Sequence, residues 1–581
     1  MQRVLWLAIT ASIALLGACA GSSEGGSGNH GGSGHFQTGG ATAQGGQPSA
    51  GALNANGGAL TNGGALANGG ALSGGSPGAG GNDTSQGGSA NGGFSSSGSA
   101  GREANGGVAN GGAANGGVPT GGRSSMQGGA ANAGATSSGG TSAGGNVGAG
   151  GQVALPPGVT KLFPPPNGTS VCPDPSLRIT FSGAPALGTS GKIQVFNSSG
   201  TVVANVDMSV ATVSDTIGGT TFKRPLPAFV DGNTAVIYLK SKALSYGQSY
   251  YVTIDSGAIR PPGGGSFSLS GNSAWRFSTA AAAPASTTAL TVALEGGGNF
   301  CSVQGALDAL PANNSAASRI TIQAGTYHEI IRSANKSNVT LHGEARKGTV
   351  IAATNNNNLN GGTATRSLVG FDGSNGLVIE NLTIHNLTPQ GGSQAEALRL
   401  QNCDKCVVRD ADILSLQDTL LWSGRIYAKN CLIAGNVDYV WGTGVAYFDK
   451  CEIRSVGRSG VIVQSRNTAS AFGYVFVDSK LSADSAATSN MLARIDVSVY
   501  PGSHVAYINC QMTNIAPAGW TITGGSAGSS LRFWEYQSVD ANGNPINVGS
   551  RIAGSTRISA AQAASMRDPA QVLNGWTPPT N

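Results

Sequence analysis

The sequence predicts an all-β protein in which a parallel β-helix follows a smaller β-sandwich. From residue 290 onward, short apolar runs recur at spacings of about 19 to 38 residues, which is typical of a coiled strand repeat. Residues 158–280 instead hold short β-branched and aromatic runs separated by Gly, Pro, Asn and Ser, which favours a sandwich. Helix-length periodic segments are scarce in both regions.

Residues 1–19 are typical of an export signal. Met1-Gln-Arg3 precedes an apolar run from Val4 to Leu16, and the following Gly17-Ala18-Cys19 completes a resemblance to a bacterial lipobox, in which the Cys thiol is acylated. The alternative is an ordinary signal peptide with Cys19 merely near its cleavage site. We favour lipidation at Cys19 because a flexible tether follows it, and we therefore expect an exported protein that is lipid-anchored to a bacterial membrane or secreted.

Residues 20–152 are expected to be a disordered Gly/Ser/Ala/Asn-rich linker. The chain contains 93 Gly in 581 residues, and about a third of this segment is Gly, with few charges and almost no large apolar side chains. Such a segment cannot bury enough surface to offset its ordering entropy. The net charge of +5 comes without a Lys/Arg run, so no nucleic-acid partner is expected. No apolar run after the first twenty residues is long enough to cross a bilayer.

The segment 158–280 is expected to form an Ig-like β-sandwich. Its opening Pro164-Pro-Pro-Asn-Gly168 and closing Trp275-Arg-Phe-Ser-Thr279 resemble bacterial Ig-like modules of surface proteins. It carries no constellation of chemical groups, so we expect a spacer or a weak carbohydrate-contacting module. The predicted strands are Leu177–Phe181, Lys192–Phe196, Ala235–Leu239, Ser249–Ile254 and Trp275–Phe277.

Nine apolar runs define the predicted β-helix, in which each coil buries its apolar face by stacking on its neighbours. They begin near Ile320, Val339, Leu377, Leu398, Ile426, Val445, Tyr474, Val505 and Leu531.

Several runs end in Asn-Cys or Lys-Cys, which predicts equivalent inward positions for the thiols of Cys403, Cys431, Cys451 and Cys510 rather than disulfides. Without Cys19 seven cysteines remain, so at least one is unpaired if the pairing is intramolecular. Their spacing is not that of a zinc site, and no metal is expected.

Two aspartates lie about one coil apart within this repeat. Asp418 and Asp438 are separated by 20 residues, which places them on neighbouring rungs of the same face. Two carboxylates so placed do not both ionise freely, and one can act as an acid while the other stays charged. This arrangement suits hydrolysis of an ester or a glycoside. From spacing alone, a pair that only hydrogen-bonds its turns is an equal alternative.

The sequence around these aspartates resembles that of the pectinesterase (pectin methylesterase) family. Gln417-Asp-Thr-Leu420 is followed by Asp438-Tyr-Val-Trp-Gly442, where the family usually has Asp-Phe-Ile-Phe-Gly. The resemblance covers about 290–580 and implies a right-handed parallel β-helix as the catalytic domain, which we place at 286–581. Four further motifs agree in order: Gly325-Thr-Tyr-His-Glu329, Gln394-Ala-Glu-Ala-Leu398, Val463-Gln-Ser-Arg466 with Gly473-Tyr-Val-Phe476, and Phe533-Trp-Glu-Tyr536.

The resemblance implies roles for individual residues. Asp438 would be the nucleophile, and Asp418 would be the general acid that later acts as base. Gln417 and Gln394 would donate hydrogen bonds to the tetrahedral oxyanion. Arg494 would bind a galacturonate carboxylate, which its planar guanidinium matches. The implied substrate is pectin, hydrolysed without a cofactor by a protein expected to be a monomer.

One segment departs from the family pattern. Arg494-Ile495-Asp496 stands where the family has Arg-Pro-Trp, so the aromatic residue that stacks on a sugar is missing there. Trp441 and Trp422 are near in sequence and could replace it, and we assign Trp441 to substrate binding, although a packed aromatic is the ordinary expectation for either. The departure also motivates two alternatives: an esterase or thioesterase acting on another acyl group, and a surface protein that binds a polysaccharide without turnover. A polygalacturonase is disfavoured because neither Asp-Asp nor Gly-His-Gly occurs in the chain. A pectate lyase needs a calcium-binding carboxylate cluster and an Arg or Lys base, and neither enzyme has a role for Gln417-Asp-Thr-Leu420.

Overall fold

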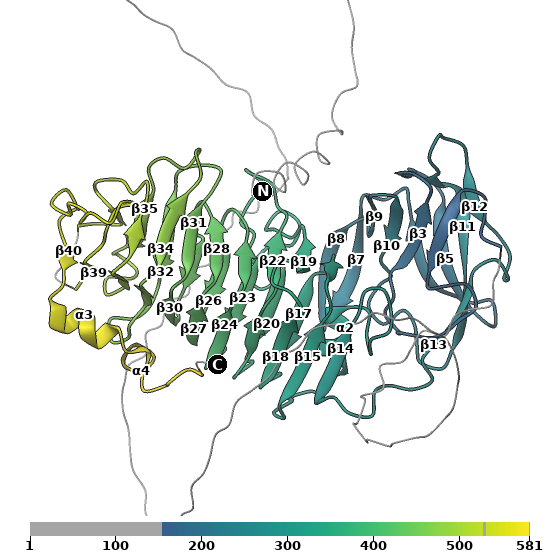
Figure 1. The fold of residues 1–581 in the computed structure, drawn as a ribbon, viewed down its shortest axis with the longest axis horizontal. Helices are drawn as coiled ribbons and strands as arrows, with labels where there is room; N and C mark the ends of the chain where they lie inside the picture. Colours follow the sequence, from purple (N-terminus) through teal and green to yellow (C-terminus); the bar gives the residue numbers. More distant parts are fainter. Residues whose placement is uncertain (1–153, 527–529, 580–581) are drawn as a thin grey trace, which may run out of the picture. The chain divides into compact units, whose positions relative to one another are not determined.

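The computed structural model describes residues 154–526 and 530–579, which all belong to one compact unit, Ala130–Asn581 (Figure 1). The expected signal segment with Cys19 and the expected linker at 20–152 lie outside the described residues. The described chain is a β-sandwich followed by three long parallel sheets, so the predicted all-β fold class is confirmed.

The sandwich is built from two sheets and a separate hairpin, and it contains every strand expected from the sequence. Trp275 is fully buried and its indole N–H donates to the carbonyl of Pro164 at 2.7 Å, which joins the opening and closing motifs of the module. One sheet holds β1 (Val159–Phe163), β3 (Leu177–Phe181), β10 (Thr234–Ile237) and β9 (Ala228–Asp231). The other holds β2 (Gly168–Val171), β13 (Arg276–Thr279), β11 (Ser249–Arg260), β5 (Lys192–Asn197) and β6 (Val202–Asp207), with β12 (Phe267–Leu269) and β4 (Ala186–Leu187) on β11. The hairpin pairs β7 (Thr212–Ile217) with β8 (Thr220–Pro225).

The β-helix consists of three parallel sheets, each of which takes one strand from nearly every coil. The first holds β14 (Ala289–Val292), β15 (Ser318–Ile322), β18 (Val339–Gly343), β21 (Val378–Glu380), β24 (Cys406–Arg409), β27 (Arg425–Lys429), β30 (Val445–Asp449), β33 (Tyr474–Val477), β36 (His504–Ile508), β39 (Arg532–Tyr536) and β40 (Ser555–Arg557). The second holds β16 (Gly325–Tyr327), β19 (Thr349–Ala353), β22 (Thr383–Asn386), β25 (Asp412–Leu414), β28 (Leu432–Gly435), β31 (Glu452–Ser455), β34 (Lys480–Ala483) and β37 (Gln511–Met512). The third holds β17 (Ile331–Ala334), β20 (Val369–Asp372), β23 (Leu398–Gln401), β26 (Leu420–Trp422), β29 (Val440–Gly442), β32 (Val461–Ser465), β35 (Met491–Asp496) and β38 (Trp520–Thr523).

Eight of the nine predicted runs fall in the first sheet, and the ninth falls in the third. The run at Leu398 is β23 of the third sheet, whereas the first-sheet strand of that coil is the short β24. Cys403 therefore follows a different sheet from Cys431, Cys451 and Cys510, and its predicted equivalence to them is wrong. The Leu398 run ends in Asn402-Cys403, the same ending as Asn430-Cys431 and Asn509-Cys510, so this sequence motif does not distinguish the two sheets.

The buried thiols follow turns with left-handed backbone. Asn430, Lys450 and Asn509 have φ of 52°, 52° and 53°, and each directly precedes a cysteine. Asn adopts this conformation more readily than most residues because its short side chain hydrogen-bonds locally. Of the cysteines in the described ranges, Cys403, Cys406, Cys431, Cys451 and Cys510 are free and buried, as expected for packed thiols.

The sandwich is joined to the first coil of the β-helix by covalent and apolar contacts. A disulfide links Cys172 to Cys301, a pairing that the sequence did not predict. Ile217 and Phe222, from the β7–β8 hairpin, are 2% and 1% exposed and belong to the hydrophobic cluster that fills the β-helix. The first coil is therefore closed by side chains of the preceding module.

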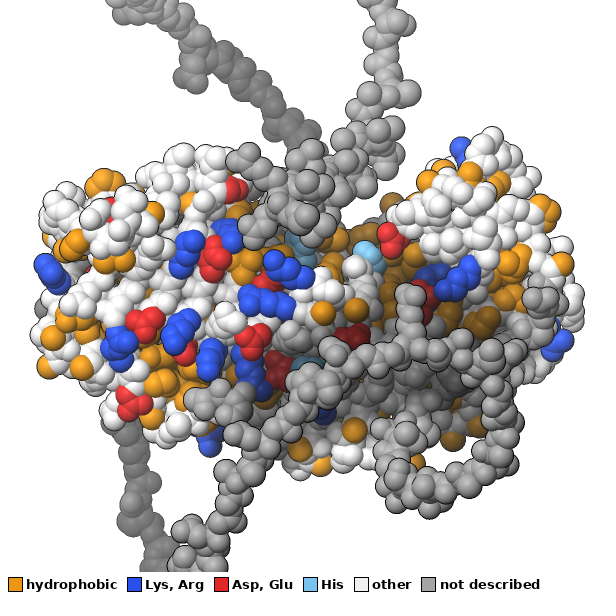
Figure 2. Space-filling model, viewed as in Figure 1, with side chains coloured by type: hydrophobic (Ala, Val, Ile, Leu, Met, Phe, Trp, Pro, Cys, Tyr) orange, Lys and Arg blue, Asp and Glu red, His pale blue; other side chains and the backbone are white. Residues whose placement is uncertain are grey.

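Helices are few and short in the described ranges. They are α2 (Val303–Ala309), α3 (Ala560–Met566) and α4 (Pro569–Val572), and none is long and apolar enough to cross a membrane. On the face shown in Figure 2, basic and acidic side chains lie next to one another over the β-helix. Arg409 pairs with Glu380 and Arg346 with Asp412, so much of the positive charge is neutralised locally.

Candidate active site

Three carboxylates occupy the same position in successive coils of the third sheet. Leu398 pairs with Leu420, and Leu420 pairs with Val440, so Glu396, Asp418 and Asp438 each stand two residues before equivalent strand positions. Adjacent rungs of a β-sheet are about 4.8 Å apart. The three side chains form the carboxylate row, in which Glu396, Asp418 and Asp438 are 0%, 7% and 4% exposed. The predicted juxtaposition of Asp418 with Asp438 is thus present in the structure.

Left-handed backbone sets both aspartates at the entrance to their strands. Asp418 and Asp438 have φ of 64° and 49°, and the amide of Asp418 donates to the carbonyl of Val437 at 3.0 Å. Aspartate tolerates this conformation better than β-branched or bulky residues do. The residues that follow, Thr419 and Tyr439, are fully buried and hydrogen-bonded inside the coil. Each turn is therefore anchored from within.

Two arginines contact the carboxylate row, one from a coil that precedes it and one from a coil that follows it. Arg366 precedes β20, and its Nη2 donates to Oε1 of Glu396 and Oδ2 of Asp418, both at 2.7 Å. Its Nε also donates to both oxygens of Glu396, at 2.9 and 3.0 Å. Arg494 on β35 donates through Nε to Oδ1 of Asp438 at 2.8 Å and through Nη2 to Oδ2.

Sequence reasoning missed Arg366 and Glu396. Glu396 lies inside the quoted Gln394–Leu398 motif, and its position two residues before an apolar run, as for Asp418, is a signal that could have found it. Arg366 is 30 positions from Glu396 and lies in no motif, so nothing in the sequence pointed to it.

The row keeps one proton at neutral pH. Burial, followed by the negative charges of Glu396 and Asp438, raises the pKa of Asp418 to about 8, against the opposing charges of Arg366 and Arg466. Burial also raises the pKa of Glu396, but its three contacts with Arg366 favour the ionised form. Asp418 is therefore the carboxyl that holds the proton.

Gln417 and Gln394 lie beside the row in adjacent coils. Gln417 directly precedes Asp418, and its carbonyl accepts from the amide of Ala395 at 3.1 Å. Gln417 also lines a hollow of about 130 Å³, together with Leu416, Asn436, Arg458, Ala395 and residues 388–393. Gln394 is half-buried, and its Oε1 accepts a hydrogen bond from Ser393 at 2.9 Å, which leaves its amide nitrogen to donate elsewhere.

The side chain of Trp441 is buried rather than open to a sugar ring. Its side chain is 5% exposed, and the guanidinium groups of Arg466 and Arg366 lie 4.6 and 5.6 Å from its ring centre. Trp422, 1% exposed, stacks on Phe448 inside the coil. Both rings are packed, which is the ordinary expectation for such aromatics, and a contact of Trp441 with substrate stays a prediction.

The unusual segment after Arg494 is accommodated by packing and by a turn. Ile495 is 1% exposed and belongs to the core, while Oδ1 of Asp496 accepts from the amide of Ser498 at 3.0 Å. Tyr500, further along the same loop, is half-buried with its ring centre 5.9 Å from the guanidinium of Arg466. Tyr500 is thus an aromatic side chain near the site that the sequence analysis did not consider.

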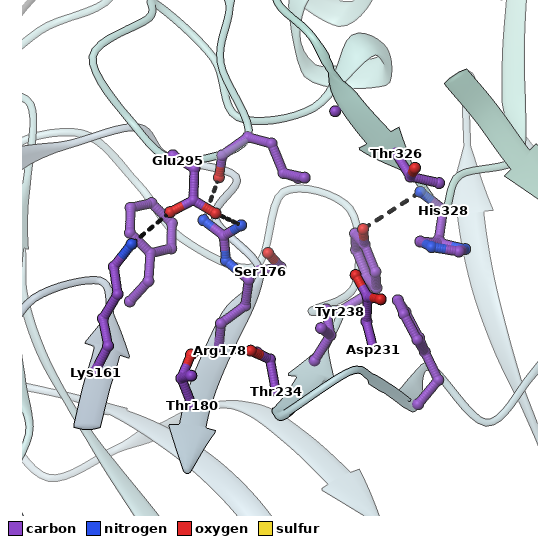
Figure 3. Close-up of a pocket in the computed structure, with 15 residues that line it drawn as sticks. Lys161, Ser176, Arg178, Thr180, Asp231, Thr234, Tyr238, Glu295, Thr326 and His328 are labelled. Atoms are coloured by element: carbon purple, nitrogen blue, oxygen red, sulfur yellow. Dashed lines mark hydrogen bonds and ion pairs between the residues drawn. The ribbon is translucent and has the colours of Figure 1, made fainter. Parts of the chain in front are cut away.

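A separate cleft of about 240 Å³ lies where the sandwich meets the first coils, and Figure 3 shows its lining. Lys161 and Arg178 converge on Glu295, and the hydroxyl of Tyr238 accepts from the amide of His328 at 3.3 Å. No member of the carboxylate row lines this cleft. The grouping suited to ester chemistry is therefore the one on the third sheet.

Comparison with known proteins agrees with this geometry. Residues 289–575 match the family model described as Pectinesterase, and residues 154–279 match that of the bacterial Ig-like domain. The chain is 31% identical over 262 residues to a probable pectinesterase A of Neosartorya fischeri, an alignment that covers 42% of this chain and 76% of that protein. The chain belongs to the pectinesterase family.

Other pectinesterases show the same likeness. Pectinesterase 31 of Arabidopsis thaliana is 31% identical over 205 residues, covering 33% of this chain and 64% of that protein. Among solved structures, the pectin methylesterase from carrot is 26% identical with a TM-score of 0.45, covering 49% of this chain and 93% of that one. The Aspergillus niger pectin methylesterase is 28% identical with a TM-score of 0.44, covering 51% and 96%.

The predicted family and the predicted Ig-like module are both confirmed. Pectinesterases are carboxylic ester hydrolases, so the enzyme class implied by the resemblance is confirmed.

Proposed function

We propose that this pectinesterase hydrolyses the methyl esters of galacturonan, the methylated form of pectin, to free carboxylate and methanol without a cofactor. The observation that carries the proposal is that Asp418, buried with a pKa raised to about 8, lies next to an arginine-held Asp438 in the next coil. An acid and a nucleophile on neighbouring rungs are what acyl transfer from an ester requires.

In the first half-reaction, a carboxylate oxygen of Asp438 attacks the ester carbonyl carbon and forms a new C–O bond. The carbonyl oxygen becomes an oxyanion, which the amide N–H groups of Gln417 and Gln394 stabilise. As the tetrahedral intermediate collapses, the bond to the methoxy oxygen breaks and Asp418 gives its proton to that oxygen. Methanol leaves, and the galacturonyl group remains on Asp438.

In the second half-reaction, the ionised Asp418 takes a proton from water, and the resulting hydroxide attacks the acyl carbon. Collapse of this intermediate releases the galacturonic acid unit, which gives its remaining proton to solvent, and restores the Asp438 carboxylate, while Asp418 keeps the proton taken from water. The cycle balances with one water consumed per methanol formed. A pKa of about 8 suits Asp418 to both steps, because it holds a proton readily and also releases it.

Arg494 serves the nucleophile first. Its two hydrogen bonds fix the plane of the Asp438 carboxylate that attacks. The Arg494 side chain is also 38% exposed, so it presents positive charge to an incoming polyuronate. The predicted contact of Arg494 with a substrate carboxylate is retained as part of the proposal.

The segments before the β-helix concern export and attachment to the cell surface. We propose that residues 1–19 direct export, that Cys19 carries a lipid anchor, and that 20–152 and the Ig-like module at 158–280 act as tether and spacer for the monomeric β-helix at 286–581. Acylation of Cys19 is tested by metabolic labelling with a fatty-acid analogue, with Cys19→Ser as the control.

The reaction is tested by measuring methanol released from highly methylated pectin by the full chain. Asp438→Ala and Asp418→Asn should each abolish turnover and leave the fold intact, as judged by circular dichroism. Asp410→Asn is the matched control, because Asp410 is also in a left-handed turn, with φ of 50°, but is exposed and remote from the row. Substantial methanol release by Asp438→Ala would overturn the nucleophile assignment.

The same assay separates the alternatives. Turnover of a thioester with none of pectin would identify a different acyl substrate. Retention of pectin on the folded protein without methanol release would identify a binding protein.

A further inference from the structure

We propose that Arg366 and Glu396 are a positioning pair for Asp418, in which Arg366 orients the carboxyl and Glu396 neutralises Arg366 so that Asp418 keeps its catalytic proton. This inference rests on the proposed role of Asp418 as general acid. It adds two residues to the site, neither of which would touch the reacting atoms.

Geometry shows how Arg366 orients Asp418. The Nη2 atom donates to Oδ2 of Asp418 at 2.7 Å, so this oxygen is fixed and Oδ1 is left to carry the transferable proton. The guanidinium is itself held by three contacts of 2.7–3.0 Å with Glu396. Because Arg366 is 8% and Glu396 0% exposed, the pair is rigid and shielded from solvent.

Charge balance explains why the pair needs both members. Within the hydrogen-bonded set, the three carboxylates of the row face two arginines, Arg366 and Arg494. If all were ionised, one negative charge would be left without compensation in a buried site, so one carboxyl retains a proton. Asp418 is that carboxyl because it shares a single Arg366 nitrogen with Glu396, whereas Asp438 has Arg494 to itself.

All charged groups that face Asp418 fit this arrangement. Glu396 and Asp438, from the adjacent coils, raise its pKa, and Arg366 and Arg466 lower it, while Arg494 interacts with it at longer range. Arg466 follows β32, and its Nη2 donates to Gln464 at 2.6 Å. Arg466 therefore acts on Asp418 through its charge rather than as a hydrogen-bond partner of the row.

Removing Glu396 and removing Arg366 would have different consequences for the site. Without the negative charge of Glu396, Arg366 would stabilise the ionised form of Asp418, and the general acid would lose its proton at lower pH. Without Arg366, Glu396 would be a buried carboxylate with no partner, a costly arrangement that would destabilise the fold.

The decisive experiment measures the pH dependence of kcat/KM for methanol release by the full chain carrying Glu396→Gln. The alkaline limb reports loss of the Asp418 proton, and we expect it to move to lower pH by about one unit or more. The matched control is Glu380→Gln, which also removes a buried carboxylate paired with an arginine, Arg409, but on the first sheet. Its limb should stay in place. An unchanged limb in a folded Glu396→Gln protein would overturn the proposal.

A double variant guards against loss of fold. Arg366→Met combined with Glu396→Leu replaces the buried pair by apolar groups of similar size, a change that proteins often tolerate. Its kcat should fall because Asp418 loses its positioning contact, but its alkaline limb should not move to lower pH, since the nearest positive charge is also gone. A downward shift equal to that of Glu396→Gln would contradict the charge argument.

Failure of the inference and failure of the proposed function give different results. Wild-type protein that releases no methanol would overturn the function. The positioning role is then read from thermal unfolding against pH, in which the decline attributable to Asp418 should lie at lower pH in Glu396→Gln than in wild type. Coincident curves would overturn the inference whether or not the enzyme is active.

Discussion

Arg494 contacts both oxygens of Asp438, although 56 positions separate the two residues and β32 lies between their strands in the sheet. A side chain predicted to be a substrate contact is therefore bound to Asp438, the proposed nucleophile. The pair joins two coils of the third sheet and fixes the orientation of the attacking carboxylate.

Arg494→Ala should lower kcat about 10- to 100-fold, because hydrogen bonds to a charged group are worth about 1.5–3 kcal/mol. If the main role of Arg494 is to hold Asp438, the loss should be similar on methylated pectin and on a small neutral methyl ester. Steady-state kinetics on both substrates measure this, and Arg494→Lys should retain part of the activity. A higher KM for the polymer alone, with kcat unchanged, would show that Arg494 acts only on the substrate carboxylate.

Gln417→Ala and Gln394→Ala should each reduce kcat about 10²- to 10³-fold with little change in KM, as expected for donors that act on the oxyanion in the transition state. The comparison is made by initial rates of methanol release at saturating pectin. Gln401→Ala, at the far end of β23, is the control and should keep wild-type rates. If KM rises while kcat is unaffected, the two glutamines bind ground-state substrate instead.

The raised pKa of Asp418 predicts a specific dependence of stability on pH. The folded state holds this proton up to about pH 8, whereas the unfolded chain releases it near 3.8. The unfolded state therefore binds fewer protons in this window, and stability falls as pH rises through it. Asp418→Asn should remove this decline, so that the variant gains stability relative to wild type as pH approaches 8. Thermal melts from pH 4 to 9 check the sign. A melting temperature of the variant that falls relative to that of wild type as pH rises would refute the prediction.

Phe222 provides a test of how far the β-helix depends on the sandwich. Phe222→Ala should destabilise the chain by about 3–5 kcal/mol, since the ring is 1% exposed within the β-helix cluster. Phe196→Ala, which removes a ring that stacks on Tyr251 within the sandwich, is the matched control and should cost less. Denaturant unfolding of both variants gives the comparison.

The same contacts predict the outcome of truncation. Residues 283–581 alone lack Ile217, Phe222 and the Cys172–Cys301 disulfide, so they should melt at lower temperature than residues 154–581. Equal melting temperatures would show that the first coil closes without the hairpin.

Much of this protein was predictable because its determinants are local or periodic. The sandwich strands, eight of the nine first-sheet runs and the one-coil spacing of Asp418 and Asp438 all follow from short apolar runs and from the length of a coil. The predicted equivalence of Cys403 failed because the Leu398 run of the third sheet ends in Asn-Cys just as two first-sheet runs do. The buried surroundings of Trp441 were also beyond sequence reasoning, because its neighbours Arg366 and Arg466 come from other coils.

The sequence by itself determined the fold class, the family and the pair of aspartates, because repeat length places residues one coil apart on the same face. The tertiary structure alone decided the charge state of the site. Whether Asp418 keeps its proton depends on Arg366, Glu396 and Arg494, and the ion pairs among these residues and the row join positions 30 or more apart. Coulomb interactions act through space and strengthen with burial, so only the folded arrangement of these side chains fixes which carboxyl attacks and which donates.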